Sequence, residues 1–183
     1  MVNVRLSLGA LGFPGISVGV EDIVLPARRK KKDPAGPFMI IAIIARDCGL
    51  ALDTARGSQS GNRPHLWPPH ADRHQLWFLH PSGVPGEVLI VSAANGLALD
   101  STTDSHKPEL LMWEPHAEAW QRWRLRKSPD GAAFEVQAAH SQWFLTASED
   151  AEREWRPWFE ERRHAWAQQW IFALPHGGDP AEG

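Results

Sequence analysis

The chain of 183 residues has a single cysteine, Cys48, and no tyrosine. One cysteine excludes an intrachain disulfide, so folding does not require an oxidising compartment. The longest hydrophobic run, residues 38–45, is far shorter than the about 20 residues of a membrane-spanning helix and is typical of a buried strand. Near the N-terminus the only early cation is Arg5, and no small-residue cleavage site follows. We therefore expect a cytoplasmic protein without a membrane span; secretion is the alternative.

The sequence also lacks an excess of charge of one sign. The 19 Lys and Arg residues nearly balance the 22 Asp and Glu residues, for a net charge of −3. A nucleic-acid-binding domain usually presents a strongly basic face, so we expect no nucleic-acid partner. The basic residues gather only at 28–32, before the Asp-Pro-Ala-Gly-Pro segment at 33–37. This pattern predicts a solvated linker, and a nuclear address or a tether to an anionic surface are the alternatives.

Sequence motifs of common enzyme classes are missing too. There is no Gly-x-Ser-x-Gly, no glycine-rich phosphate loop and no His-Glu-x-x-His, so we predict that the protein is not an enzyme and needs no cofactor. Four histidines lie close together in the sequence: His65, His70, His74 and His80. His70 and His74 have the i,i+4 spacing of helical metal ligands, but they follow two prolines between expected strands, without a carboxylate or thiolate motif. We therefore predict no metal site.

The most informative feature of the chain is an internal triplication. A Gln-x-Trp triplet occurs at residues 75–77, 121–123 and 168–170, so its tryptophans are 46 and 47 residues apart. A Gly-Leu-Ala-Leu-Asp segment at 49–53 recurs at 96–100, and a degenerate copy stands at 142–146. Two markers with one period predict three structural units of one kind. Unit one comprises residues 38–83, unit two 84–131 and unit three 132–176.

Each unit contains the signals of four short strands in the same order. An apolar strand is followed by the Leu-Ala-Leu-Asp-type strand, then by a short strand that ends in Trp, and then by the Gln-x-Trp strand. Regularly spaced short strands with turn signals between them predict an all-β barrel or sandwich. Twelve strands in three pseudo-symmetric units match a β-trefoil over residues 38–176, between an N-terminal extension (1–37) and a C-terminal tail (177–183). The expected strands lie at 38–45, 88–93 and 133–138, at 49–53, 96–100 and 142–146, and at 65–67, 111–113 and 156–158.

The order of these motifs resembles the repeat of ricin-B-type lectin domains. The resemblance covers residues 38 to about 176 and implies carbohydrate binding, with one shallow pocket per unit for a hexose of galactose or N-acetyl-sugar type. The chemistry is suitable, because a carboxylate accepts charge-assisted hydrogen bonds from sugar hydroxyls and an aromatic ring covers the apolar C–H face of the sugar. A carbohydrate or glycoconjugate is therefore the expected partner.

In unit one the resemblance assigns carbohydrate binding to five residues. Asp53 matches the sugar-binding aspartate, Trp67 the stacking aromatic residue and Gln75 the glutamine of the Gln-x-Trp triplet. His65 lies where a polar residue often assists. His74 stands where sugar-binding copies of the repeat have Asn, and its imidazole can hydrogen-bond a hydroxyl.

In unit two the resemblance assigns the same roles to Asp100, Trp113 and Gln121. Trp120 occupies the Asn position, where it either adds stacking area or blocks the pocket. In unit three the aspartate is replaced by Thr146 and the Trp-ended strand is altered to Arg-Pro-Trp at 156–158. We therefore expect working pockets in the first and second units only.

Structural roles remain open for several of these residues. The tryptophans of the Gln-x-Trp triplets are expected in the core, the glutamines are expected to bond backbone groups in part, and Asp53 and Asp100 could cap turns. The alternative function is a protein–protein interaction scaffold that has lost sugar binding. Its candidate surface is the Trp- and Arg-rich insertion at 152–163 in unit three, because exposed Trp and Arg often anchor protein interfaces.

Overall fold

The computed structural model describes residues 16–17, 39–70, 72–102, 108–147 and 155–175. Most of the predicted N-terminal extension with its basic run, the predicted C-terminal tail and the first part of the unit-three insertion lie outside the described residues. Within the described ranges no helix is long and apolar enough to cross a membrane.

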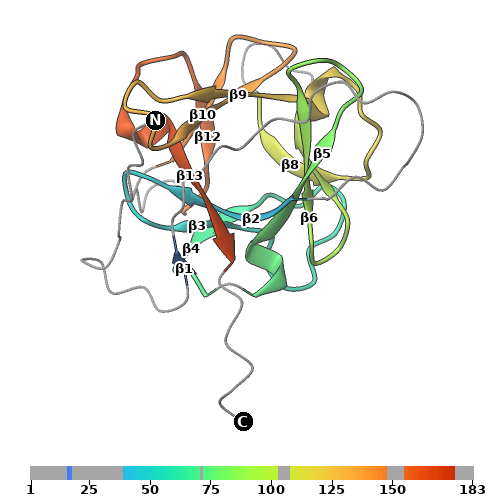
Figure 1. The fold of residues 1–183 in the computed structure, drawn as a ribbon. Coiled ribbons are helices and arrows are strands. Elements are labelled where there is room, and N and C mark those ends of the chain that lie inside the picture. Colours follow the sequence, from blue (N-terminus) through green and yellow to red (C-terminus); the bar gives the residue numbers. More distant parts are fainter. Residues whose placement is uncertain (1–15, 18–38, 71, 103–107, 148–154, 176–183) are drawn as a thin grey trace.

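Six strands close into an antiparallel barrel (Figure 1). Neighbouring strands around the barrel are β13, β10, β9, β6, β5 and β2, in this order. The pairing of β13 with β2, in which Ile171 lies opposite Ile44, closes the ring. Closure leaves the barrel without an open sheet edge. The barrel strands are β2 (Met39–Ala45), β5 (Leu76–Pro81), β6 (Val88–Ser92), β9 (Trp123–Lys127), β10 (Phe134–Ala138) and β13 (Gln169–Pro175).

Three two-stranded hairpins complete the fold, one in each unit. Barrel and hairpins together confirm the predicted β-trefoil. The strands with predicted bounds begin and end within two residues of them, and in the third hairpin the second strand is displaced as a whole by two residues. A further short strand, β1 (Ile16–Ser17), pairs with the end of β13. The hairpins are β3 (Ala51–Asp53) with β4 (His65–Trp67), β7 (Ala98–Ser101) with β8 (Leu110–Trp113), and β11 (Phe144–Thr146) with β12 (Trp158–Glu160).

The tryptophans of the three Gln-x-Trp triplets form the centre of the core. Each is fully buried, and each indole N–H donates to the carbonyl of a leucine in the first hairpin strand of its own unit. The three rings therefore fill the core, as the sequence predicts, and their hydrogen bonds also fasten the hairpins to the barrel. The donor–acceptor pairs are Trp77 with Leu52 at 3.1 Å, Trp123 with Leu99 at 3.2 Å and Trp170 with Leu145 at 2.9 Å.

A short 3-10 helix precedes the last strand of each unit: η1 (Arg73–Gln75), η2 (Ala119–Gln121) and η4 (Trp166–Gln168). Each ends at the glutamine of the triplet, and the tight turn directs that side chain inward, where it is buried.

Earlier in the units, Gly49 and Gly96 have φ values of 72° and 76° before β3 and β7. This left-handed conformation favours glycine and explains its place at the head of the Leu-Ala-Leu-Asp segments.

The third hairpin corrects one prediction. The strand expected at 156–158 is β12, which begins at Trp158 and ends at Glu160. Pro157 has no N–H to donate to the ladder, so pairing starts after it. In this register Glu160 lies opposite Phe144, as Trp67 lies opposite Ala51 in unit one. A glutamate therefore replaces the exposed tryptophan of the other two units.

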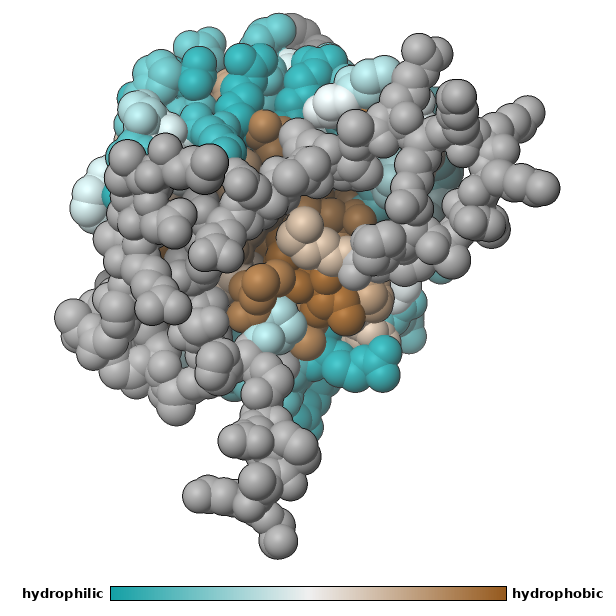
Figure 2. Space-filling view, viewed as in Figure 1, coloured by the Kyte–Doolittle hydropathy of each residue, from teal (hydrophilic) through white to brown (hydrophobic). Residues whose placement is uncertain are grey.

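The surface on the side seen in Figure 1 is divided by polarity. Figure 2 shows an apolar area where β2, β5 and β13 meet, with polar side chains above and below it.

In unit three the Arg162 guanidinium donates to the fully buried Glu135 carboxylate at 2.6 and 2.9 Å. This ion pair attaches the end of the insertion to β10, since a buried charge is stable only when it is paired.

Candidate functional site

The two aspartates of the repeat, Asp53 and Asp100, occupy equivalent places near the ends of β3 and β7. Asp53 Oδ1 accepts the Ala55 N–H at 2.6 Å, so this aspartate also orders the turn that follows it. Asp53 Oδ2 and Asp100 Oδ2 each accept a hydrogen bond of 2.9 Å from the glutamine of the same unit. Both carboxylates are nearly buried, and a small part of each remains accessible.

The glutamines hold these carboxylates from below. Gln121 Nε2 donates to Asp100 Oδ2 and to the Glu114 carbonyl, both at 2.9 Å, and its Oε1 accepts the His116 N–H at 2.8 Å. Gln75 makes the equivalent bonds in unit one. Because both side chains are buried and their amide protons are used, they position the aspartates and have no surface to offer a ligand.

In unit two a cavity of about 210 Å³ opens above the carboxylate. Trp113, whose side chain is 44% exposed, supplies one wall, and Trp120 from η2 supplies a second. The sequence-predicted residues Asp100, Trp113 and Trp120 are thus brought together, and Gln121 lies beneath them. Thr102 and His116, which the sequence analysis did not assign, also line this cavity.

The His116 imidazole connects the acid to an aromatic ring. Its Nε2 lies 3.3 Å from Asp100 Oδ2, and the Trp120 indole N–H points to the same Nε2 at 3.2 Å. Nε2 can accept the indole N–H or donate its own proton to Asp100, but not both. If Nε2 accepts the indole N–H, Asp100 Oδ2 keeps its acceptor capacity for a ligand; if Nε2 donates to Asp100, the Trp120 N–H remains available as a donor.

Burial also affects the acid itself. It raises the pKa of the Asp100 carboxyl above its ordinary value of 3.8, against the hydrogen bond from Gln121 and the nearby His116, which act in the opposite direction. A carboxylate in low-dielectric surroundings forms stronger hydrogen bonds to a ligand than one in water. The same surroundings make its protonation easier.

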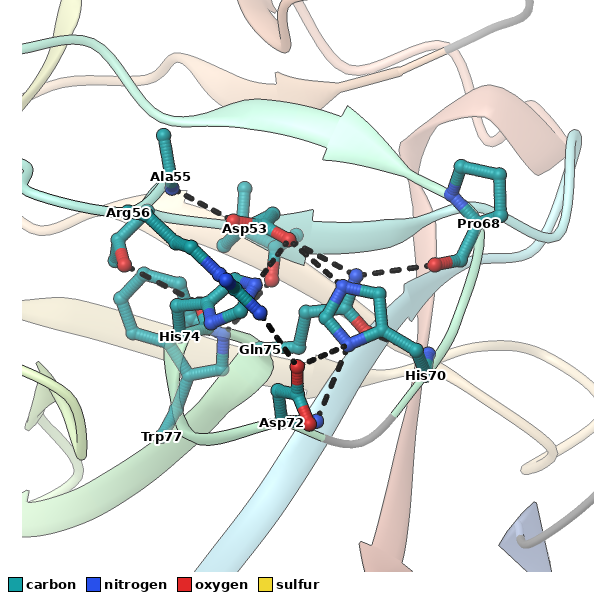
Figure 3. A network of polar contacts seen from close by, with 11 residues as sticks. Asp53, Ala55, Arg56, Pro68, His70, Asp72, His74, Gln75 and Trp77 are labelled. Atoms are coloured by element: carbon teal, nitrogen blue, oxygen red, sulfur yellow. Dashed lines mark hydrogen bonds and ion pairs between the residues drawn. The ribbon is translucent and has the colours of Figure 1, made fainter.

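In unit one the equivalent place is filled by imidazoles. Figure 3 shows His70 and His74 turned toward Asp53, with Gln75 between them. His70 Nε2 lies 3.6 Å and His74 Nε2 3.7 Å from Asp53 Oδ2. Trp67, 53% exposed, lies on β4 with its ring edge-on to His65, 5.9 Å between centroids.

His65 lies opposite Asp53 in the β3–β4 pair, and His74 and Gln75 lie at its carboxylate. The fifth residue predicted for unit one, Trp67, lies opposite Ala51 and contacts the His65 ring. Burial lowers the pKa of the His65 imidazole, although the charge of Asp53 acts in the opposite direction.

Unit three lacks the acid and the aromatic wall. Gln168 keeps its place, but its Nε2 reaches the Thr146 hydroxyl at 3.3 Å, and its Oε1 accepts the Arg163 N–H at 2.7 Å. Glu160 takes the position of Trp67 and Trp113. Thr146 offers a hydroxyl where the other two units have a carboxylate, and the absence of a sugar pocket from unit three stays a prediction.

The sequence contains a signal for the histidines that we missed. Residues 69–72 read Pro-His-Ala-Asp and residues 115–118 read Pro-His-Ala-Glu, at the 46-residue interval of the repeat. His70 and His116 are equivalent, since the N–H of each donates to the Oε1 of its own glutamine at 2.8 Å. The period that identified the tryptophans would also have identified this pair.

Comparisons with known proteins agree with this architecture. The family model described as "Ricin-type beta-trefoil lectin domain-like" matches residues 73–154. None of the curated proteins compared with the chain matches it in sequence.

Among solved structures, the designed three-fold symmetric protein ThreeFoil is 23% identical, with a TM-score of 0.66 over 73% of this chain and 96% of its own. The Rhizoctonia solani agglutinin is 15% identical, with a TM-score of 0.65 over 79% of this chain and all of its own. The Macrolepiota procera ricin B-like lectin in complex with lactose is 15% identical, with a TM-score of 0.63 over 78% of this chain and all of its own. The resemblance predicted from the three Gln-x-Trp repeats is therefore confirmed: residues 73–154 match the model of ricin-type β-trefoil lectin-like domains, and the chain shares the β-trefoil fold of these structures.

Proposed function

We propose that the protein is a lectin-like module that binds a hexose of galactose or N-acetyl-sugar type in the cavity of unit two. The observation that carries the proposal is the meeting of the Asp100 carboxylate with the exposed face of Trp113 in one cavity of about 210 Å³. A monosaccharide presents vicinal hydroxyls on one edge and C–H groups on one face, which matches this pair. Similar architecture in a lactose-bound relative supports the same class of ligand.

Each lining residue has a defined role in this proposal. Asp100 accepts two sugar hydroxyls, and charge-assisted hydrogen bonds of this kind are about twice as strong as neutral ones. Trp113 stacks on the C–H face, and Trp120 closes the opposite side. Since the site is shallow, a single pocket has an expected affinity near the millimolar range, about −4 kcal/mol.

A glycan array probed with the full chain tests the proposal. We expect binding that falls by about tenfold in Trp113→Ala, since stacking contributes about 1–2 kcal/mol. Binding should be lost in Asp100→Ala, whose folding is checked by its melting temperature. Trp67→Ala, at the equivalent place in unit one, is the matched control for Trp113→Ala.

The result that would contradict the assignment is wild-type binding to the array in Asp100→Ala and Trp113→Ala. Loss in Trp67→Ala alone would move the working pocket to unit one.

Acidification should weaken carbohydrate binding before it unfolds the domain. Because burial raises the pKa of Asp100, its protonation midpoint lies above pH 3.8, and the protonated acid no longer accepts charge-assisted bonds. The sign for stability is opposite: a carboxyl with a raised folded-state pKa favours the folded state more as the pH falls. Sugar affinity and melting temperature measured from pH 7 to pH 3 test both effects. Asp100→Asn has no carboxyl at this position, so its affinity should not change with protonation there. A binding midpoint at or below 3.8 would contradict the assignment.

A protein-interaction scaffold is the second candidate. Trp166 is 59% exposed, with the Arg46 guanidinium stacked 4.4 Å from its ring centroid, and Trp155 is exposed on the insertion of unit three. Exposed Trp beside Arg is the composition of interface anchors. If the folded chain binds no glycan, we propose the surface around Trp166 and Arg46 as the binding face, and loss of a captured partner in Trp166→Ala would support it.

A further inference from the structure

We propose that Asp53, His70 and His74 form a binding site for a divalent transition metal, with zinc as the representative ion. The three residues come from separate segments, β3, the loop before η1 and η1 itself, and their ligand atoms all lie within 4.8 Å of one another. Two imidazole nitrogens and one carboxylate oxygen are a donor set that zinc accepts in proteins.

The spacing of the donor atoms favours a metal over direct hydrogen bonds. His70 Nε2 and His74 Nε2 lie 3.6 and 3.7 Å from Asp53 Oδ2, longer than hydrogen bonds between nitrogen and oxygen. Ligands about 2.0–2.1 Å from a tetrahedral zinc ion are about 3.3 Å from one another. The two Asp–His separations exceed that value by a few tenths of an ångström, and all three ligand atoms lie within 4.8 Å of one another, so metal binding would draw the two rings together.

The carboxylate of this group is held in place on its inner side. Asp53 is 2% exposed; its Oδ1 accepts the Ala55 N–H at 2.6 Å and its Oδ2 accepts Gln75 Nε2 at 2.9 Å. The second lone pair of Oδ2 faces the imidazoles. A preorganised ligand costs little entropy to bind, and hydrogen bonds of this kind orient metal-binding carboxylates.

A second carboxylate stands behind one of the imidazoles. Asp72 Oδ2 lies 3.6 Å from His70 Nδ1, on the side of the ring away from Asp53 (Figure 3). A carboxylate that accepts from Nδ1 leaves Nε2 unprotonated and raises its basicity, which is the usual arrangement behind a zinc-bound histidine. In the described structure His70 Nδ1 accepts the Asp72 N–H at 3.2 Å, so metal binding would reverse the direction of bonding at this nitrogen.

Unit two provides the internal comparison. Asp100 and His116 reproduce Asp53 and His70, with Oδ2 and Nε2 3.3 Å apart. The equivalent of His74, however, is Trp120, which offers no metal ligand. The proposal therefore predicts one site in the molecule at this position of the repeat and identifies His74 as the residue that creates it.

Isothermal titration of the full chain with zinc sulfate tests the site. We expect one high-affinity equivalent in the wild type, at least tenfold weaker binding in His74→Asn, and no binding at this position in His74→Trp, which copies unit two. Trp120→His should gain a second equivalent, because it completes the same three ligands there. His80→Ala is the control for binding to a histidine outside the cluster and should keep the wild-type stoichiometry.

A second readout separates the site from general histidine binding. Cobalt(II) bound by nitrogen and oxygen ligands in a tetrahedral site gives visible absorption, which should appear in the wild type and be absent in His74→Asn, while the melting temperature without metal stays unchanged. Zinc binding that persists unchanged in His74→Asn and His74→Trp, a wild-type stoichiometry of zero, or a Trp120→His variant that gains nothing would overturn the proposal.

Discussion

Replacing Trp123 by alanine should lower the free energy of unfolding by about 3–5 kcal/mol. The indole is fully buried, stacks parallel to Phe159 with 6.1 Å between ring centroids, and donates its N–H to the Leu99 carbonyl at 3.2 Å. Alanine leaves a cavity that this close-packed barrel cannot fill, and it removes the donor that fastens β7 to the core. Urea denaturation of the full chain measures the change.

Trp67→Ala is the matched control for this prediction. The same substitution removes a side chain that is 53% exposed, and surface changes of this kind cost less than about 1 kcal/mol. Equal losses in the two variants would mean that burial of the Gln-x-Trp tryptophans does not determine stability. A wild-type unfolding midpoint in Trp123→Ala would remove its core role altogether.

Gln121→Leu should both destabilise the fold, by about 3 kcal/mol, and abolish carbohydrate binding in unit two. Leucine has a similar size but leaves Asp100 Oδ2, the Glu114 carbonyl and the His116 N–H without their buried partner, and each such group costs about 1–3 kcal/mol. Loss of the amide donor also raises the pKa of Asp100 further, so less of the carboxylate remains charged. Unfolding by urea and titration with the sugar identified on the array measure the two effects.

Gln168→Leu is the control that separates the loss of stability from the loss of carbohydrate binding. Gln168 makes the equivalent bonds in unit three, but to the Thr146 hydroxyl at 3.3 Å in place of a carboxylate. We expect a smaller loss of stability, because no buried charge loses a donor, and unchanged carbohydrate binding. If both variants lost binding equally, the effect of Gln121 would be a general loosening of the trefoil instead of the positioning of Asp100.

The trefoil and its core could be predicted from the sequence because both follow from the repeat. A unit that recurs three times must bury equivalent positions in equivalent ways, since one unit alone cannot cover its apolar face. The buried tryptophans follow from this rule, whereas the loss of the pocket in unit three, marked by Thr146, stays a prediction. The third hairpin was misplaced by two residues because it was aligned on its tryptophan, although Pro157 already excluded pairing there.

The roles of the site residues needed the tertiary structure. Gln75 and Gln121 belong to the predicted binding set, but only the 3-10 turns before β5 and β9 show that their side chains point inward and hold the carboxylates. The position of His116 in the wall of the unit-two cavity likewise became visible only in the structure. Side-chain direction depends on the path of the backbone, which residue types alone do not define.

The sequence by itself determined the number of units, the β-trefoil and the core tryptophans, because a repeat period expresses local structure that each unit carries. Its resemblance to lectin repeats predicted a carbohydrate ligand. Only the tertiary structure brought Asp53 to His70 and His74, which are 17 and 21 residues away along the chain. Asp72 lies between the two histidines in the sequence, but the spacing of these residues alone did not indicate a metal site. Asp53 lies on β3, and only the fold of the chain places its carboxylate beside the two imidazoles. The groups of a site are neighbours in space and need not be neighbours in the sequence.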